Sequence, residues 1–254
     1  MKMAATCLQL DVGNSSAKWR LLNEGQVRAR GEYCPDDDGS KQALLTCAPL
    51  LEQIWVSSVA GPETEGALLA LLTRCWPVTP WLASTPARTG ELCNSYAEPS
   101  RMGVDRWLAM LGGRARCTDR LCVVDAGSAL TIDIVAASGQ HEGGYIVPGP
   151  GLMERALLGE TGRVRFAEEV GYELSPGTST AMAVRHGIAL AQVGALALAL
   201  DRAGPERPRL LFCGGGGELL CQLLGRGGDY APDLVFEGLE MLADSRDESQ
   251  ASRT

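Results

Sequence analysis

The sequence predicts an α/β protein in which one structural unit occurs twice, and two observations carry this prediction. Each half of the chain opens with closely spaced strand-like segments and continues with alternating strands and helices. The first strand of each half also ends in an aspartate with a glycine two residues later, at Asp11 and at Asp125. We therefore expect two related domains, residues 1–116 and 117–254, with the boundary between Gly112 and Arg120.

The first half begins with three apolar or alternating segments that are typical of a β-meander. Leucines at helical spacing then predict a helix after an acidic loop. The expected elements are strands at 6–12, 17–22 and 26–33, a helix at 41–53, a strand at 54–59, a helix at 63–75, a strand at 78–82, a loop-rich segment at 86–99 and a helix at 105–116.

The second half repeats this order and adds a long segment rich in alanine and leucine. The expected elements are strands at 121–124, 130–136 and 142–147, a helix at 152–158, a long helix at 180–203, a strand at 209–213, a helix at 218–224, a strand at 234–236 and a helix at 237–243. The polar residues 244–254 are expected to fray at the chain end.

The composition is that of a folded soluble protein. The chain has 254 residues, of which 45% are hydrophobic and 21% charged. Its net charge of -8 argues against a nucleic-acid partner, because phosphate backbones require clustered Lys and Arg. No secretory signal precedes the first strand, and the longest apolar stretch, 187–200, is too short to span a bilayer. We expect a cytoplasmic protein with no membrane partner.

Cysteines and histidines offer little metal chemistry. The nine cysteines are an odd number, scattered from Cys7 to Cys221 with no CxxC pair, so neither a disulfide framework nor a zinc site is expected. Reduced, mostly buried thiols are the expectation. Only His141 and His186 are present, which is too few for a histidine metal site.

The first aspartate–glycine turn, residues 11–18, has the composition of a phosphate-binding turn. Asp11 ends a strand, and the small residues after it turn tightly and present backbone N–H groups to an anion. The Asp11 carboxylate suits the counter-cation of the phosphates, directly or through water, and Lys18 lies across the hairpin. An ordinary β-hairpin, with Asp and Asn supplying the turn chemistry, is the alternative.

The second turn, residues 125–133, repeats this design at the start of the second half. Two aspartates on buried strands that face one cleft are costly unless a cation lies between or beside them. The repeat therefore predicts a metal–nucleotide site in a cleft between the two domains. For Asp133, at the end of the motif, a solvent-facing strand position is the alternative.

An acidic and a basic residue, Asp105 and Arg106, stand side by side at the start of the helix expected at 105–116. Arg binds a substrate carboxylate through its planar fork, and Asp accepts a proton from a hydroxyl that attacks phosphorus. Helix capping by Asp105 with a surface Arg106 is the alternative.

Two glycine-rich segments complete the candidate site. Residues 143–149 end a strand in a sharp turn, and their glycines allow close approach of a ligand or of a neighbouring strand. Residues 214–217 follow a strand and precede a helix, where a nucleotide base and ribose can lie close to the backbone. The chain contains neither a GxGxxG dinucleotide fingerprint nor a GxxxxGK[ST] motif.

Taken together, these segments resemble the type III pantothenate kinase family of the acetate kinase, sugar kinase, Hsp70 and actin superfamily. The resemblance spans Leu8 to Leu239 and rests on residues 11–18, 103–106, 125–133 and 143–149, with residues 179–183, Gly187 and 232–239 in support. It implies two duplicated ribonuclease H-like domains, the actin-like ATPase fold, with a nucleotide cleft between them.

The resemblance further implies ATP-dependent phosphorylation of pantothenate to 4'-phosphopantothenate, the first step of coenzyme A biosynthesis. It makes Asp105 the catalytic general base, Asp125 the ligand of a monovalent cation (potassium or ammonium) and Asp11 the residue that holds magnesium through water. The implied ATP-binding residues are Asp11, Val12, Gly13, Asn14, Ser15, Ser16, Ala17, Lys18 and Ser128. The implied substrate-binding residues are Tyr96, Gly103, Val104, Asp105, Arg106 and Thr180. Members of the family are homodimers, and their substrate site is expected to involve the partner subunit.

Three positions differ from the family pattern. Ser15 and Ser128 stand where threonine is usual and keep the hydroxyl, and Ser179 stands where asparagine is common. The residues leave two other functions open. The first is a kinase for another small hydroxy acid or a sugar, and the Asp105–Arg106 pair favours an anionic acceptor. The second is a non-catalytic nucleotide-binding regulator. The presence of Asp11 and Asp125 argues against the regulator.

Overall fold

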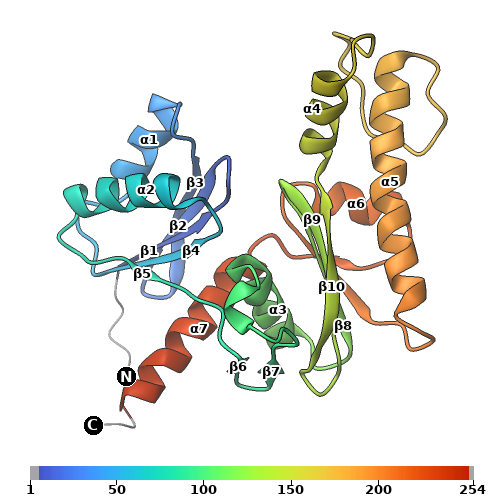
Figure 1. The fold of residues 1–254 in the computed structure, drawn as a ribbon. Coiled ribbons are helices and arrows are strands. Elements are labelled where there is room, and N and C mark those ends of the chain that lie inside the picture. The colour runs from blue at the N-terminus through green and yellow to red at the C-terminus, as the bar shows by residue number, and fades with distance from the viewer. Residues whose placement is uncertain (1–5, 252–254) are drawn as a thin grey trace. The chain divides into compact units, whose positions relative to one another are not determined.

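The structure is a computed structural model that describes residues 6–251, with side chains described as far as residue 246. The chain, drawn in Figure 1, divides into two compact units. The first contains the chain up to Thr89, then Tyr96–Gly112 and the segment from Val235 onward, and the second contains Gly90–Ser95 and Gly113–Leu234. These units cut the chain differently from the expected ranges 1–116 and 117–254, because the last helix packs within the first unit.

A five-stranded sheet of order β3-β2-β1-β4-β5 forms the first unit. β1 to β3 are antiparallel, while β4 runs parallel to β1 and β5 parallel to β4. Apolar side chains that alternate along β1 bury one face of the sheet under α1 and α2, and the other face meets α7 through Arg20 and Phe236. The elements are β1 (Cys7–Val12), β2 (Ala17–Asn23), β3 (Gln26–Tyr33), α1 (Asp38–Leu45), β4 (Gln53–Ser58), α2 (Pro62–Cys75), β5 (Trp81–Leu82) and α7 (Leu234–Ala251).

The second unit repeats this sheet in the order β10-β9-β8-β11-β12. β8 to β10 are antiparallel, and β11 and β12 continue in parallel. Side chains from one face of β8, β9 and β11 form a core with α5 and α6. The elements are β8 (Leu121–Ala126), β9 (Ala129–Val135), β10 (His141–Pro148), α4 (Pro150–Glu160), α5 (Thr180–Arg202), β11 (Arg209–Cys213), α6 (Gly217–Leu224) and β12 (Asp229–Tyr230).

The equal strand order of the two sheets agrees with the duplication predicted from the two aspartate–glycine turns. The remaining elements are two short strands, a 3-10 turn and one helix. They are β6 (Arg88–Thr89), β7 (Leu92–Cys93), η1 (Pro99–Arg101) and α3 (Val104–Arg116).

Three predicted elements differ from the structure, and the tail expected to fray from residue 244 is helical as far as Ala251. The helix expected at 41–53 ends at Leu45, before Pro49, because proline lacks the N–H and clashes with the preceding turn of a helix. The strand expected at 78–82 is limited to two residues of β5. The strand expected at 234–236 is wrong, since α7 begins there: residues 234, 235, 236, 239, 242 and 243 are buried at helical spacing, a period that three residues alone do not reveal.

Helix α5 is long and apolar. Among the described residues it is the helix whose length and hydropathy would suffice to cross a membrane, and a third of its most apolar window, 33%, is buried in the protein.

Candidate functional site

A polar row crosses the sheet of the first unit where β1 ends. The strand register sets Asp11 directly opposite Lys18 of β2 on one side and Ser57 of β4 on the other, and Lys18 in turn faces Glu32 of β3. Directly opposed residues share a face of a sheet, so the four side chains form one row, Glu32–Lys18–Asp11–Ser57. The row joins a carboxylate, an exposed ammonium and two further oxygen groups on neighbouring strands.

Side-chain and backbone hydrogen bonds hold this row and its turn. Ser57 Oγ donates to Asp11 Oδ1 over 3.1 Å, and Ser16 Oγ donates to Glu32 Oε1 over 2.9 Å. The Gly13 N–H closes the turn on the Ser16 carbonyl at 2.9 Å. Asn14 and Ser15 are exposed at the tip, so the backbone of the turn faces solvent and is open to an anion.

The predicted ATP-binding set is split between the two faces of the sheet. Asp11 and Lys18 lie in the polar row, whereas Val12 and Ala17 belong to the buried core on the opposite face. On that core side a pocket of about 240 Å³ borders the turn. Residues 13, 15 and 16 of the turn line it together with residues 33, 35, 63, 64, 67 and 68. From sequence, the eight residues were assigned to one binding surface. Because successive side chains of a strand point to opposite faces, the eight divide between the two faces of the sheet.

The predicted acceptor residues begin at α3 in the same unit. A side chain at Gly103 would approach Asp105 Oδ1 to 2.6 Å and Val59 Cγ1 to 3.6 Å, so the start of α3 lies against the residue that follows β4. Because β4 is the strand next to β1, the acceptor motif stands beside the end of the sheet that carries Asp11. Asp105 Oδ1 accepts the backbone N–H of Arg106 at 2.7 Å, which fixes its carboxylate in the first turn of the helix.

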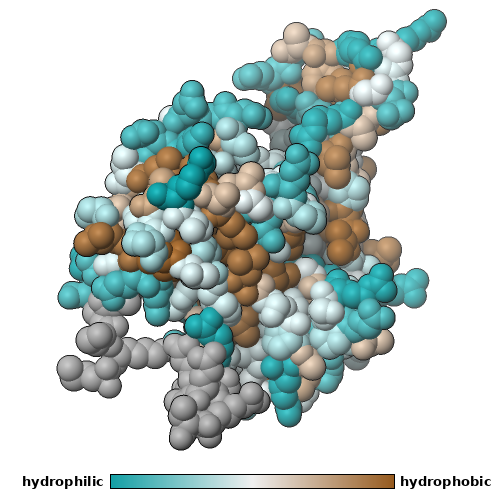
Figure 2. All heavy atoms as spheres, turned by 60° about the vertical axis from the view of Figure 1, so that its left-hand side comes forward, coloured by the Kyte–Doolittle hydropathy of each residue, from teal (hydrophilic) through white to brown (hydrophobic). Residues whose placement is uncertain are grey.

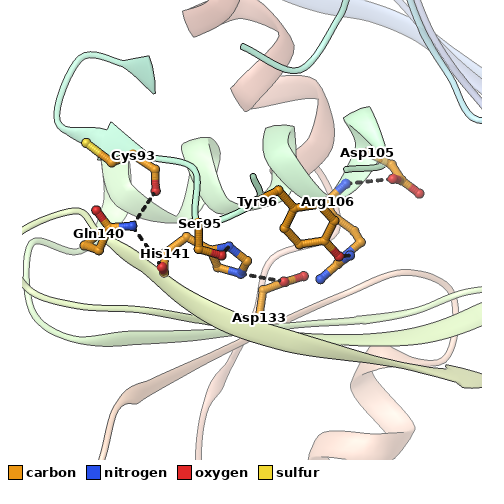
Figure 3. Close-up of polar contacts among 8 residues, drawn as sticks. All are labelled: Cys93, Ser95, Tyr96, Asp105, Arg106, Asp133, Gln140 and His141. Atoms are coloured by element: carbon orange, nitrogen blue, oxygen red, sulfur yellow. Dashed lines mark hydrogen bonds and ion pairs between the residues drawn. The ribbon is translucent and has the colours of Figure 1, made fainter. Parts of the chain in front are cut away.

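Arg106 is only 5% exposed, which excludes the alternative of a surface arginine. Its Nη1 donates to the Tyr96 hydroxyl at 2.9 Å, and its guanidinium carbon lies 5.8 Å from the centre of the Tyr96 ring (Figure 3). The structure thus brings together three of the predicted acceptor residues, Tyr96, Asp105 and Arg106. A buried guanidinium held by an aromatic hydroxyl suits the recognition of a carboxylate.

The second unit contains a row in the equivalent place. Asp125 of β8 lies opposite Thr131 of β9 and Cys213 of β11, and Thr131 faces Ile146 of β10. Here the neighbouring group is backbone: Gly214 has φ of +78°, and a side chain on it would collide with Asp125 Oδ1 and come within 2.6 Å of the Ala126 carbonyl oxygen. The glycine-rich segment 214–217, interpreted from sequence as a nucleotide approach, therefore encloses Asp125.

Backbone hydrogen bonds tie the second turn to its neighbours. The Gly149 N–H donates to the Ser128 carbonyl at 3.0 Å, and the Gly216 N–H donates to the Ala126 carbonyl at 2.9 Å. Ser128 itself is exposed at the turn. The segment 143–149 consequently acts as the partner of the second turn, in keeping with the close strand approach that its glycines predicted.

Thr180, the last predicted substrate residue, opens α5 in the second unit. Ser179 caps this helix by accepting the Met182 N–H at 3.2 Å, so the position where the family commonly has asparagine serves as an N-cap. Thr180 lines a groove of about 680 Å³ between α4 and α5, together with mostly apolar residues such as Leu152, Val184 and Ile188.

Sequence reasoning missed Ser57 and left the setting of Asp133 open. Ser57 was included only in a short strand, although a serine pair at the end of a buried strand beside that of Asp11 is a usable signal. Asp133 is 1% exposed, which excludes the solvent-facing alternative, and it accepts from His141 Nε2 at 3.0 Å. With Nε2 donating to the carboxylate, His141 Nδ1 accepts the Ser95 hydroxyl at 2.8 Å (Figure 3).

The cysteines are free thiols, and burial lowers the reactivity of those in the core. Only four of the nine are buried, so the expectation of mostly buried thiols is wrong. Burial raises the pKa of Cys7 to about 12, with Glu240 adding to the effect and Arg20 opposing it. Burial likewise raises the pKa of Cys122 to about 12, with a smaller contribution from Asp133. These thiols are therefore protonated and unreactive near neutral pH.

Neither aspartate belongs to a metal-binding cluster of side chains in the described part of the chain. Among residues 6–246, whose side chains the structure describes, no group of three His, Cys, Asp or Glu side chains forms a metal cluster. A single carboxylate at Asp11 agrees with magnesium, which is bound by one or two carboxylates together with substrate phosphates. Asp125 lies against the Gly214 backbone, with Cys213 directly opposite it on β11.

Comparison with known proteins identifies the family. The model of the family described as type III pantothenate kinase matches residues 7–202. The chain belongs to this family. Among named relatives, the type III pantothenate kinase of Cellvibrio japonicus is 35% identical over 246 residues, covering 94% of this chain and 97% of the relative. The type III pantothenate kinase of Chromohalobacter salexigens is 36% identical over 241 residues, covering 92% and 85%.

Solved structures agree in fold at much lower identity. A protein of Campylobacter jejuni described as a conserved putative Baf family transcriptional activator is 22% identical, with a TM-score of 0.60 over 95% of this chain and 99% of that one. A putative 2-dehydro-3-deoxygalactonokinase of Sinorhizobium meliloti is 17% identical, with a TM-score of 0.54 over 94% and 98%. The predicted fold class, that of actin-like ATPases and sugar kinases, is confirmed.

Proposed function

We propose that this protein is a pantothenate kinase, a phosphotransferase that uses ATP to convert pantothenate to 4'-phosphopantothenate in the first step of coenzyme A biosynthesis. The observation that carries the proposal is the type III pantothenate kinase match over residues 7–202, which contains both aspartate turns and the acceptor motif. The polar row at Asp11 and the Tyr96–Arg106 pair support it, since they supply a phosphate-side carboxylate and an acceptor-side guanidinium within one unit.

The acceptor side consists of Tyr96 and residues 103–106. Arg106 binds the pantothenate carboxylate through its fork while Tyr96 keeps the guanidinium oriented. Asp105 takes the proton of the primary hydroxyl as that oxygen attacks the γ-phosphorus of ATP in line. The hydrogen bond from the Arg106 N–H holds the Asp105 carboxylate in one orientation, so that it accepts the proton from a defined side. Gly103, Val104 and Thr180 complete the substrate contacts.

The nucleotide side consists of residues 11–18 and Ser128. Backbone N–H groups of the exposed turn and Lys18 bind the phosphates, and Ser128 adds a hydroxyl contact. Asp11 would hold magnesium through water, and Asp125 would hold a potassium or ammonium ion. Bound cations offset the negative charge of the phosphates, the main electrostatic requirement of phosphoryl transfer.

We further propose that the protein is a cytoplasmic homodimer. Large apolar side chains are exposed on β10, α4 and α5, and Figure 2 shows apolar side chains gathered on the upper right-hand part of the molecule that carries α4 and α5. Leu190 and Leu198 of α5 are 61% and 58% exposed, and Ile146 of β10 is 63% exposed. A second copy that covers this surface would remove them from water. Sedimentation analysis of the wild type and of Leu190→Glu tests this, with dissociation expected only in the variant.

A coupled assay of ADP release with pantothenate, run with and without potassium, tests the activity. We expect pantothenate-dependent ADP formation that potassium increases, with 4'-phosphopantothenate identified by mass spectrometry. Pantothenol, which keeps the hydroxyl but lacks the carboxylate, should be a poor acceptor because Arg106 has nothing to bind. Equal rates with pantothenol or a sugar would favour a different acceptor, and no turnover with any acceptor would favour a nucleotide-binding regulator.

The general base is tested by Asp105→Asn. This variant keeps the shape of the side chain but removes its basicity, so kcat should fall by roughly 10²–10⁴-fold. Asp119→Asn, at an exposed aspartate of the other unit, is the matched control and should retain the wild-type rate. Near-normal turnover of Asp105→Asn would exclude the proposed role.

A further inference from the structure

The hydroxyl of Ser57 lies in the interior of the first unit. Ser57 is fully buried, with 0% exposure, near the end of β4, on the face of the sheet that carries Asp11 and opposite to the face of the core residues Ile54 and Val56. Burying a hydroxyl costs free energy unless it makes a hydrogen bond. Ser57 makes that bond to Asp11 Oδ1, at 3.1 Å, across the parallel pair of β4 and β1.

This hydrogen bond restricts the Asp11 carboxylate. Asp11 is half-buried near the end of β1. Without such a contact, the last torsion angle of an aspartate side chain takes a broad range of values. A donor fixed in a sheet, one strand away, selects one orientation of the carboxylate plane. The β4 backbone is itself held against β1 at this point, since the Val59 N–H donates to the Val12 carbonyl at 3.0 Å.

We propose that Ser57 is a positioning residue of the nucleotide site, which orients the Asp11 carboxylate toward the divalent cation of the bound nucleotide without touching the nucleotide itself. The proposal rests on the proposed function, because it assigns Asp11 to that cation. It adds a residue that lies outside the aspartate–glycine turn and 46 positions away in the chain. Its expected effect is therefore on binding of the metal–nucleotide complex rather than on binding of pantothenate.

The chain contains a matched control in the next residue. Ser58 has the same side chain on the same strand but lies opposite Val12 on the other face of the sheet. Its buried Oγ makes no hydrogen bond among the residues that the structure describes. Ser58→Ala therefore removes a hydroxyl from the same strand without touching Asp11.

The test measures binding of Mn²⁺ with ADP by electron paramagnetic resonance, and steady-state kinetics, on the full-length protein. For Ser57→Ala we expect the Kd of Mn²⁺·ADP and the KM for ATP to rise about three- to tenfold, the effect of losing one hydrogen bond of typical net strength. The KM for pantothenate should stay within about twofold. Ser57→Thr keeps the hydroxyl on a β-branched side chain suited to a strand and should restore Mn²⁺·ADP binding. Ser58→Ala should bind as the wild type does.

The outcomes separate the two proposals. If the wild type binds Mn²⁺·ADP and phosphorylates pantothenate but Ser57→Ala matches it in both measurements, the positioning role is overturned and the kinase proposal stands. The role is also overturned if Ser57→Ala raises both KM values equally while its melting temperature falls, because that pattern reports general loss of structure. A wild type that neither binds Mn²⁺·ADP nor turns over ATP overturns the kinase proposal and this inference with it.

Discussion

The two units place an aspartate at the same point of the same sheet but surround it differently. In the first unit a side chain, Ser57, contacts the carboxylate of Asp11, and the row continues through charged residues. In the second unit Cys213 and the glycine after it take the equivalent place, and the Gly214 backbone closes on Asp125. The duplicated scaffold thus fixes where the carboxylate lies, while the residues at the end of β4 and of β11, with Gly214 after β11, decide what surrounds it.

A second contrast lies on β1 and β8, two residues before Asp11 and Asp125. Arg20 and Asp133 occupy equivalent positions, opposite Gln9 and Val123, and both are buried. Arg20 pairs with Glu240 of α7 at 2.6 Å, whereas Asp133 bonds to His141 of its own hairpin. Each unit compensates its buried charge internally, as buried charges require. The sign of that charge is free to differ once a partner is available.

The largest expected effect comes from removing each carboxylate in turn. Asp11→Asn should lower kcat/KM for ATP by roughly 10²–10³, the usual cost of losing one charge-stabilising group at a phosphoryl site, with the potassium response unchanged. Asp125→Asn should instead raise the potassium concentration needed for half-maximal rate. Initial rates as a function of ATP and of potassium distinguish the two. If both variants lose ATP affinity alone, the two aspartates do not differ in role.

The next effect concerns stability at one equivalent position. Gly214→Ala places a side chain against Asp125 at a left-handed φ, so the free energy of unfolding should fall by about 1–3 kcal/mol or more. Ser58→Ala, at the matching place in the first unit, removes a buried hydroxyl without a partner and should leave stability unchanged or slightly higher. Urea denaturation measures both. A Gly214→Ala variant as stable as the wild type would show that the second carboxylate is not enclosed.

The strands and the aspartate turns could be predicted from sequence because their signals are local. Apolar alternation along residues 6–12 and the Asp-x-Gly spacing do not depend on tertiary contacts. The beginning of α7 at Leu234 could not be predicted from three apolar residues, because strand and helix patterns coincide over so short a run. Its packing against β2 of the first unit depends on Arg20, more than 200 positions earlier in the chain.

The candidate site divides in the same way. Asp11, Asp105, Arg106 and Asp125 were predicted from motifs, and the structure supplies the contacts that spacing does not contain. Ser57 shares no motif with Asp11, and only the β1–β4 register brings the two together. The division of residues 11–18 between two faces follows from the alternation of side chains along a strand, so it could have been predicted from the hairpin.

A smaller effect is the pH dependence of the stability that the buried thiol of each unit contributes. Burial raises the folded-state pKa of Cys122 to about 12, well above the ordinary value of a thiol, so its neutral form is favoured in the folded protein. The stability from this preference is present below about pH 9 and is lost as the pH rises toward 12. The difference in unfolding free energy between wild type and Cys122→Ala should therefore shrink by about 1 kcal/mol between pH 8.5 and 10.

Cys7 of the first unit provides the parallel measurement, since burial raises its pKa to about 12 as well. Cys7→Ala should show the same direction of change, because the effect of burial exceeds the opposing effect of Arg20. Cys75→Ala, at an exposed thiol, is the control for removing a thiol outside the core. A constant difference across this range for both buried thiols would contradict the effect of burial.

The smallest expected effect concerns how each turn is held. Besides its own Gly13–Ser16 backbone bond, the first turn has a side-chain bond from Ser16 to Glu32, whereas the second has backbone bonds to Gly149 and Gly216. Glu32→Gln weakens an exposed, charge-assisted bond, so the KM for ATP should rise only about twofold, with kcat unchanged. Glu52→Gln, at an exposed glutamate outside the row, is the control and should leave the KM unchanged. Because this bond is exposed, added salt should reduce the difference between Glu32→Gln and wild type, and a difference that salt does not reduce would place the contribution of Glu32 in packing rather than in charge.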